Sequence, residues 1–400
     1  MAKSTPRRRA EPTRRWKRTD KPARLAPEPI PERDPEPAPP PAPPVAGEAD
    51  PLTPPPRSRV GARLLAALWV LVALAGAALL VVGLFGSELL PTDRLELPAG
   101  LRAVDLTSPW LPQVGSVVVA TAYVWALAAR TGGRPIVFGL LTVAVGGVTL
   151  WADRDVLRNG AAVMVCVLSA VLAVVATVPA VKLRHAVREV VVAMVIATLG
   201  GLATVGLQPS LDVGRFEYVT LGLAFVGCFG MVYRLGAGLH GLGRRGIFSV
   251  VFGVVVLGLT LAYAELLARY GTPVLVEWIF DAARWMRDTL GASPRPIIAL
   301  LGIPALVWGT HMRARRRQGW WVCAFGVGAT APIASALIDP TVAREEVGLA
   351  IGYGLVVGLA LGGLLIRADL ALTGQRGRGA RRAEEAAAIR PEPARIEALL

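Results

Sequence analysis

Cysteine, histidine and lysine are scarce in this sequence, and each scarcity narrows what the protein can be. Only 3 of the 400 residues are cysteine, and all lie inside apolar runs, so we expect buried thiols and no disulfide framework. The 3 histidines stand among arginines, which repel cations, so we expect no metal site. Lysine occurs 4 times against 39 arginines, a bias typical of GC-rich bacterial genomes.

Motifs that carry chemistry are also missing. The sequence contains no Walker-type phosphate loop, no G-x-S-x-G elbow, no H-E-x-x-H and no C-x-x-C. We therefore expect no cofactor, and the sequence favours a non-enzymatic protein. The first apolar run begins near residue 64, so we expect no cleavable signal peptide.

Apolar residues dominate what is present. Hydrophobic residues make up 54% of the chain and charged residues 18%. Of the 43 lysines and arginines, 14 lie before residue 64 and 7 after residue 366. A soluble domain would need a solvated face on each helix, and the long middle section has none. The pattern predicts an all-α, polytopic transmembrane helix bundle.

Residues 1–60 have a different composition and are expected to form a disordered cytoplasmic tail. Residues 1–24 carry ten basic residues against two acidic ones, and the run from Pro35 to Pro44 can form neither a helix nor a strand ladder. Beside a membrane, such a tail attracts anionic lipid headgroups by about 1 kcal/mol per basic residue. The expected partners are therefore lipids, with other membrane proteins or further copies of the chain as alternatives and no nucleic acid.

Ten apolar runs within residues 61–367 predict ten membrane-spanning helices. A span needs about 17 to 25 residues, and the shorter runs are extended by their flanks. Residues 273–290 predict an amphipathic helix at the outer interface, and residues 368–400 a second cytoplasmic tail, partly helical or disordered. The expected spans are 64–86, 114–129, 136–151, 160–181, 190–207, 218–239, 247–263, 297–312, 320–338 and 347–366.

The charges in the connectors between these runs alternate in sign and predict the orientation of the chain. One set of connectors carries twelve basic residues and a single acid, Glu189. The other set carries ten arginines and fifteen acids. The positive-inside rule then places both termini in the cytoplasm and the protein in the cell membrane, as a multi-pass protein of the bacterial cytoplasmic membrane. The basic set includes Arg130, Arg134, Lys182, Arg184, Arg188, Arg244, Arg245, Arg313, Arg315, Arg316 and Arg317.

Three acids in the expected outer connectors are candidates for catalysis. Asp153 and Asp155 flank one arginine, and carboxylate oxygens at this spacing can hold a divalent metal. Glu88 follows the first run, where some membrane glycosyltransferases that use lipid-linked sugars also place acids. The simpler interpretation is a solvated turn, and it is the one we favour.

Three further charged residues are candidates for a binding site. Arg234 lies within the sixth run, where a charge marks a functional site unless its side chain reaches the headgroups. Glu217 and Glu265 lie at the outer ends of two consecutive runs, which a hairpin would bring together. They could form a proton or cation site, although acids at the membrane interface are commonly solvated.

Glycines in the last run predict close helix packing. Gly354, Gly358 and Gly362 recur every four residues, so that another backbone can approach. Pro304 and Pro332 interrupt the eighth and ninth runs, and kinks are expected there.

The function hypotheses rest on this architecture. The leading hypothesis is a permease or a membrane subunit of envelope machinery, since ten spans suit a five-plus-five inverted repeat. One alternative is a membrane enzyme, similar to a glycosyltransferase, acting on a lipid-linked substrate at the outer face. Another is an anchor or scaffold for the cytoplasmic tail.

Overall fold

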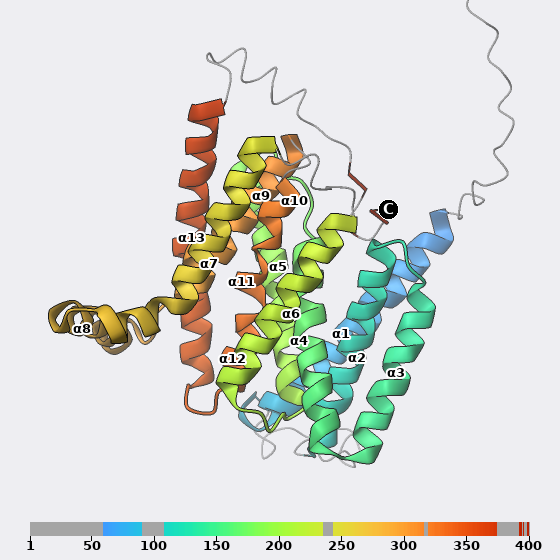
Figure 1. Cartoon of the computed structure of the whole chain (residues 1–400). Helices are drawn as coiled ribbons and strands as arrows, with labels where there is room; N and C mark the ends of the chain where they lie inside the picture. Colours follow the sequence, from blue (N-terminus) through green and yellow to red (C-terminus); the bar gives the residue numbers. More distant parts are fainter. Residues whose placement is uncertain are drawn as a thin grey trace, which may run out of the picture. The chain divides into compact units, whose positions relative to one another are not determined.

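A computed structural model describes residues 59–89, 108–234, 243–315, 319–373 and five residues near the carboxyl end, namely Glu392, Pro393, Arg395, Ala398 and Leu399. Within these residues the structure is helical and contains no strand (Figure 1). The expected tail 1–60 lies outside the described residues, apart from the start of the first helix. The helices are α1 Arg59–Leu89, α2 Trp110–Arg130, α3 Pro135–Ala152, α4 Asp155–Val175, α5 Leu183–Gly206, α6 Val213–Arg234, α7 Gly243–Tyr270, α8 Pro273–Leu290, η2 Ile297–Gly302, α9 Ile303–Arg315, α10 Gly319–Ala324, α11 Val327–Thr330, α12 Pro332–Ile338 and α13 Arg344–Thr373.

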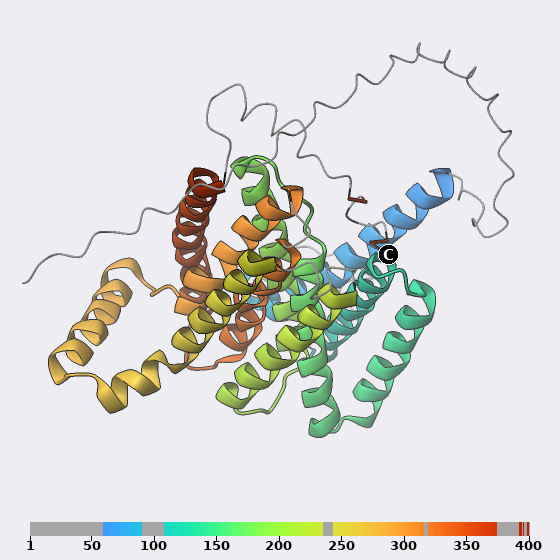
Figure 2. The same ribbon diagram turned by 45° about the horizontal axis from the view of Figure 1, so that its top comes forward.

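Nine described segments are long and apolar enough to cross a membrane, and the chain is a multi-pass helical membrane protein. The expected seventh span, 247–263, lies in α7, where the described part contributes only the shorter apolar stretch Val250–Leu259. The expected helix 273–290 coincides with α8. Figures 1 and 2 both draw α8 projecting away from the other helices, beyond α7 and α13.

Local sequence explains where several helices begin and end. Pro135 and Pro273 open α3 and α8 at a position where a missing N–H costs no helical hydrogen bond. Asp212 caps α6 by accepting a hydrogen bond from the N–H of Arg215 at 2.9 Å. Gly291 ends α8 with φ +78°, a left-handed conformation that a residue without Cβ adopts readily.

The core lies around two adjacent spans that are not continuous α-helices. In Ile297–Arg315, the π-helix η2 leads into α9, and in Gly319–Ile338 the helix breaks into α10, α11 and α12. Each of these spans has 89% of its most apolar stretch buried, against 11% for α1 and for α3. A Cβ added at Gly309 would lie 2.7 Å from the backbone nitrogen of Cys323, so the two chains meet at backbone distance.

The two ends of the bundle differ in charge. We call the end at which α2, α4 and α9 finish the basic end. We call the opposite end, at which α3 and α12 finish, the acidic end. At the acidic end Asp339 accepts hydrogen bonds from the N–H and the hydroxyl of Thr341, which lower the pKa of Asp339.

Candidate functional site

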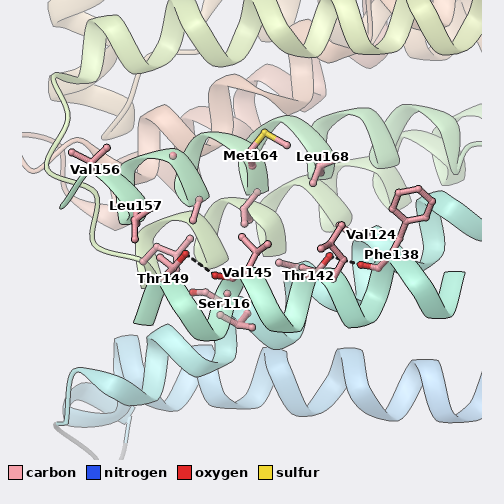
Figure 3. A pocket seen from close by; sticks show the side chains of 18 residues that line it. Ser116, Val124, Phe138, Thr142, Val145, Thr149, Val156, Leu157, Met164 and Leu168 are labelled. Atoms are coloured by element: carbon pink, nitrogen blue, oxygen red, sulfur yellow. Dashed lines mark hydrogen bonds between the residues drawn. The ribbon is translucent and has the colours of Figure 1, made fainter. Parts of the chain in front are cut away.

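An apolar groove lies between α2, α3 and α4 (Figure 3). Its volume is about 480 Å³, within the range of about 300–1,000 Å³ that small-molecule sites occupy. The walls are formed chiefly by aliphatic side chains, with Phe138 on α3 and Met164 on α4 facing the space. Such an apolar surface is complementary to a hydrocarbon chain.

The polar side chains in this groove are already satisfied by their own helices. The hydroxyls of Thr142 and Thr149 donate to the carbonyls four residues earlier, at 2.8 and 2.9 Å. Ser116 donates to the carbonyl of Pro112 at 2.8 Å. With these hydrogen bonds made inside the helices, the groove needs no polar group from an occupant.

Small residues explain why a groove forms here. A Cβ added at Gly146 would lie 2.6 Å from Val117, so α3 packs tightly against α2 along this side. On the α4 side, Gly160 has no atom within 4 Å of an added Cβ, and this residue lines the groove. The space between α3 and α4 therefore stays open because α4 presents no side chain at that position.

The turn between α3 and α4 stands at the acidic end of the groove. Thr149 and Val156 line the groove on either side of this turn, which contains Asp153, Arg154 and Asp155. Asp153 forms an ion pair with Arg158 in the first turn of α4. Acidic and basic side chains therefore alternate at the end of the groove where a bound hydrocarbon chain would meet water.

Asn159 joins this turn to the connector before α6. Its amide donates to the hydroxyl of Ser210 at 3.3 Å and accepts from the N–H of Ser210 at 2.8 Å. This pair of hydrogen bonds fixes the polar end of the groove against a second connector, which gives the turn a defined shape.

Two of the three predicted catalytic acids, Asp153 and Asp155, lie at the turn between α3 and α4. Asp153 and Asp155 are both exposed, and Asp153 already has a cationic partner. Glu88 lies in the last turn of α1, but its side chain falls outside the described set. Among the described residues no group of three or more metal-ligating side chains occurs.

The predicted binding residues belong to two consecutive helices, α6 and α7. Arg234 is exposed at the last residue of α6. Glu217 forms an ion pair with Arg295, with 3.6 Å between Oε2 and Nη1. Glu265 lies in α7, and its side chain is outside the described set.

The glycine row of α13 faces the core span. A Cβ added at Gly354 would lie 3.2 Å from Ile298, and one at Gly358 would lie 2.6 Å from Ile303. One at Gly362 would collide with Val307. The row therefore packs against η2 and α9 of the same chain, where larger residues would separate the helices.

A second feature, which the sequence did not single out, is a charged cluster at the basic end. Three guanidinium groups donate to three consecutive carbonyls where α4 finishes. Arg130 donates to Val175 at 3.4 Å, and Arg395 donates to Ala176 at 3.1 Å. Arg313 donates to Thr177 at 3.1 Å. Cations placed here complement the negative end of the α4 dipole and satisfy carbonyls that have no helical partner.

Glu189 supplies the negative charge of this cluster. Its side chain is fully buried and accepts a hydrogen bond from the N–H of Val178 at 3.0 Å. Arg188 and Arg395 both donate to it, with Arg395 reaching the two carboxylate oxygens at 3.0 and 2.8 Å. A buried carboxylate is tolerated only with such partners.

Arg313 and Arg130 are the two fully buried arginines among the described residues. Sequence analysis placed Arg313 in a connector, but α9 continues to Arg315 and the Arg313 side chain has no exposed surface. Its guanidinium carbon lies 3.4 Å from the ring centre of Trp320, and Nη1 donates to the Thr177 hydroxyl at 2.7 Å. Nη2 donates to Glu392 at 2.6 Å, which closes the ion pair.

The described residues of the carboxyl-terminal segment 392–399 thus contact the bundle at four places. Besides Glu392 and Arg395, the carbonyl of Pro393 accepts a hydrogen bond from Arg130 at 3.3 Å. The N–H of Leu399 donates to the carbonyl of Arg130 at 2.8 Å. In the sequence, only Glu189 indicated this cluster. It is the single acid among the basic connectors, where an acid is expected to pair with a neighbouring basic residue.

Comparison with known proteins adds no relative. No protein-family model, no curated protein and no solved structure matches this chain.

Proposed function

We propose that this chain is a non-enzymatic membrane subunit that holds one hydrocarbon chain of a lipid in the groove between α3 and α4. In this proposal the protein has ten spans, with both termini in the cytoplasm of a bacterial cell, and it belongs to envelope machinery. The observation that carries the proposal is the apolar groove of about 480 Å³ that ends at a charged turn.

A lipid chain is held in the groove by selective contacts rather than by burial of apolar surface. Inside a bilayer a hydrocarbon chain gains no hydrophobic free energy by leaving other lipids, so shape and headgroup contacts must favour the groove. Arg154 is exposed at its acidic end, and Arg158 stands one turn further along α4. Guanidinium groups at this place suit a lipid phosphate. The occupant expected from these features is a single-chain portion of an anionic lipid.

The same geometry supports binding over catalysis. An enzyme acting on a lipid-linked substrate would need acids that converge on the reacting bond. Asp153 is instead paired with Arg158, and Asp155 is exposed. The contacts described for these acids therefore favour binding over catalysis, and the headgroup contacts are left to the arginines of this turn.

One observation favours a permease as the second candidate. The two most buried spans are both interrupted, by η2 in one and by the breaks around α11 in the other. Discontinuous helices at the centre of a bundle often line transport paths. Contact at backbone distance between these spans, as at Gly309 and Cys323, supports the subunit role more directly, because it leaves no space between them.

A photoactivatable lipid tests the groove. The full chain would be reconstituted in bilayers that contain a phosphatidylglycerol with a diazirine midway along one acyl chain. We expect labelled residues to concentrate on α3 and α4 between 138 and 168. Gly160→Trp fills the groove without a backbone collision, and Gly147→Trp is the matched control, since its Cβ also meets nothing within 4 Å but does not line the groove.

The expected result is a several-fold loss of α3–α4 labelling in Gly160→Trp and none in Gly147→Trp. Equal labelling of α1, α3 and α13 in the unmodified protein would refute a specific lipid site. Uptake of small solutes into the same vesicles tests the permease candidate, which predicts more uptake than in vesicles without the protein, whereas the subunit proposal predicts no difference.

Orientation is tested separately by single cysteines, one at each end of the bundle. Lys182→Cys at the basic end should react with a membrane-impermeant maleimide only in opened cells. Asp339→Cys at the acidic end should react in intact cells. The native cysteines are buried and give little background. The reverse pattern would overturn the proposed placement of both termini.

A further inference from the structure

The charged cluster at the basic end has the construction of a receptor rather than of a simple ion pair. Arg313 and Glu189 belong to α9 and α5, and neither side chain has exposed surface. Their partners Glu392 and Arg395 lie outside, with 13% and 30% of their side chains exposed. The buried groups are thus carried by the bundle, and the outer groups are carried by a short segment resting on it.

The buried groups remain oriented without that segment. Arg313 is held by two hydrogen bonds to Thr177 and by the ring of Trp320. Glu189 is held by the N–H of Val178 and by Arg188. A site whose charged groups are fixed by neighbouring contacts loses little entropy when an occupant binds.

The occupant is read by two charges in a fixed order. A carboxylate meets Arg313, and a guanidinium three residues later meets Glu189 and the carbonyl of Ala176. The planar fork of arginine reaches both Glu189 oxygens and a carbonyl at once, which the ammonium of lysine cannot do with the same geometry. Reversing the order would place like charges together in a buried position.

One of the two residues between these charges also fits. Pro393 accepts a hydrogen bond from Arg130 through its carbonyl. Because proline has no N–H, this position leaves no donor without a partner. Its fixed φ also limits the freedom that the segment loses on docking. Glutamate, proline and a following arginine are therefore all used by the site.

We propose that the basic end of the bundle is a peptide-binding site for the pattern Glu-Pro-X-Arg, that residues 392–395 occupy it as an exchangeable segment, and that a partner protein presenting the same pattern displaces them. The partner is recognised by the order of its charges. Binding of the partner would release the carboxyl-terminal segment of this chain from the site, and the released segment would then be exposed.

Photo-crosslinking in the unmodified bundle tests the exchange. The full chain in nanodiscs would carry a photoreactive residue at the exposed position Ala398, beside Leu399, which is hydrogen-bonded to Arg130. We expect adducts on the turn between α2 and α3. Added peptide with the sequence of residues 390–399 should reduce these adducts in a concentration-dependent way. A matched peptide with the positions of Glu392 and Arg395 exchanged should leave them unchanged.

A binding measurement provides the second arm. Fluorescence anisotropy of the labelled peptide should give a dissociation constant at least about tenfold lower for Glu392→Ala/Arg395→Ala than for the unmodified chain, because the tethered competitor is removed. A peptide with lysine in place of the arginine should bind more weakly than the parent. Should the double variant fail to fold, the crosslinking arm on the unmodified bundle still decides.

Two results would overturn the proposal. One is that neither peptide changes the crosslink and neither binds the vacated site, which would make residues 392–399 a permanent part of the bundle. The other is that the parent and exchanged peptides act alike, which would reduce the contact to unspecific charge attraction.

Discussion

The two ends of the bundle treat charge in opposite ways. At the basic end, Glu189 and Arg313 are fully buried, and contacts from Val178, Arg395, Thr177 and Glu392 join them to distant parts of the chain. At the acidic end the pair of Glu217 and Arg295 keeps more than a quarter of each side chain exposed, and on α8 the pair of Asp281 and Arg284 keeps more than 60%. Net charge therefore distinguishes the two ends of the bundle, whereas burial of a charged side chain marks a contact with specific partners.

The largest expected effect comes from removing a buried cation. Arg313→Ala should destabilise the protein by about 3–5 kcal/mol, because Glu392 and the carbonyl of Thr177 lose their partner. Arg284→Ala at the surface is the control and should change stability by less than about 1 kcal/mol. Thermal unfolding in the same detergent compares the two. Equal effects would erase the distinction between the ends.

The next effect concerns packing at the centre. Gly302→Ala should cost about 1–3 kcal/mol, since its Cβ would collide with the backbone of Ala329. Gly222→Ala, whose Cβ meets nothing within 4 Å, should be neutral or slightly stabilising. The measurement is again the unfolding midpoint. A neutral Gly302→Ala would mean that the interrupted spans can move apart, which would favour the permease candidate.

A double-mutant cycle sharpens the contrast between the pairs themselves. Glu189→Gln with Arg395→Ala should give a coupling free energy of about 1–3 kcal/mol, from a buried carboxylate bound at both oxygens. The cycle on Asp281 and Arg284 should give about 0.5 kcal/mol or less. Coupling energies of the same size in both cycles would contradict the buried contact.

The smallest effect is expected at Asp339. Its pKa in the folded state lies below the unfolded value because Thr341 donates two hydrogen bonds to it. The stabilisation is therefore present above the unfolded pKa and is lost as the pH falls through the folded pKa. Asp339→Asn should lower stability by less than about 0.5 kcal/mol at neutral pH, and the difference should fade in acid. A difference that grows in acid would have the wrong sign.

Nine of the ten expected spans match described segments that are long and apolar enough to cross a membrane, whereas the seventh, 247–263, is matched only by the shorter stretch Val250–Leu259. The helix 273–290 was also predictable, since its charges and indoles separate at helical spacing. The ends were less predictable. Arg313 looked like a connector residue, but partners from three other segments allow α9 to continue past it.

The groove and the charged cluster were beyond sequence reasoning for the same physical reason. Gly160 is informative only once α3 is known to lie beside it, and Glu189 only once Arg395 is known to reach it. Asp153 and Asp155 were singled out by their spacing, yet their environment depends on Arg158, which the helix brings back over the turn. Contacts between distant parts of a chain leave no local pattern.

The order in which the chain is synthesised affects when the contacts of the carboxyl-terminal segment can form. Residues 392–399 leave the ribosome after all the described helices have been made, yet they complete the surroundings of Arg313 and Glu189. Until then, the side chains of Arg313 and Glu189 lack some of their hydrogen-bond partners. The contacts at this end are consequently completed only after the last described helix has been synthesised.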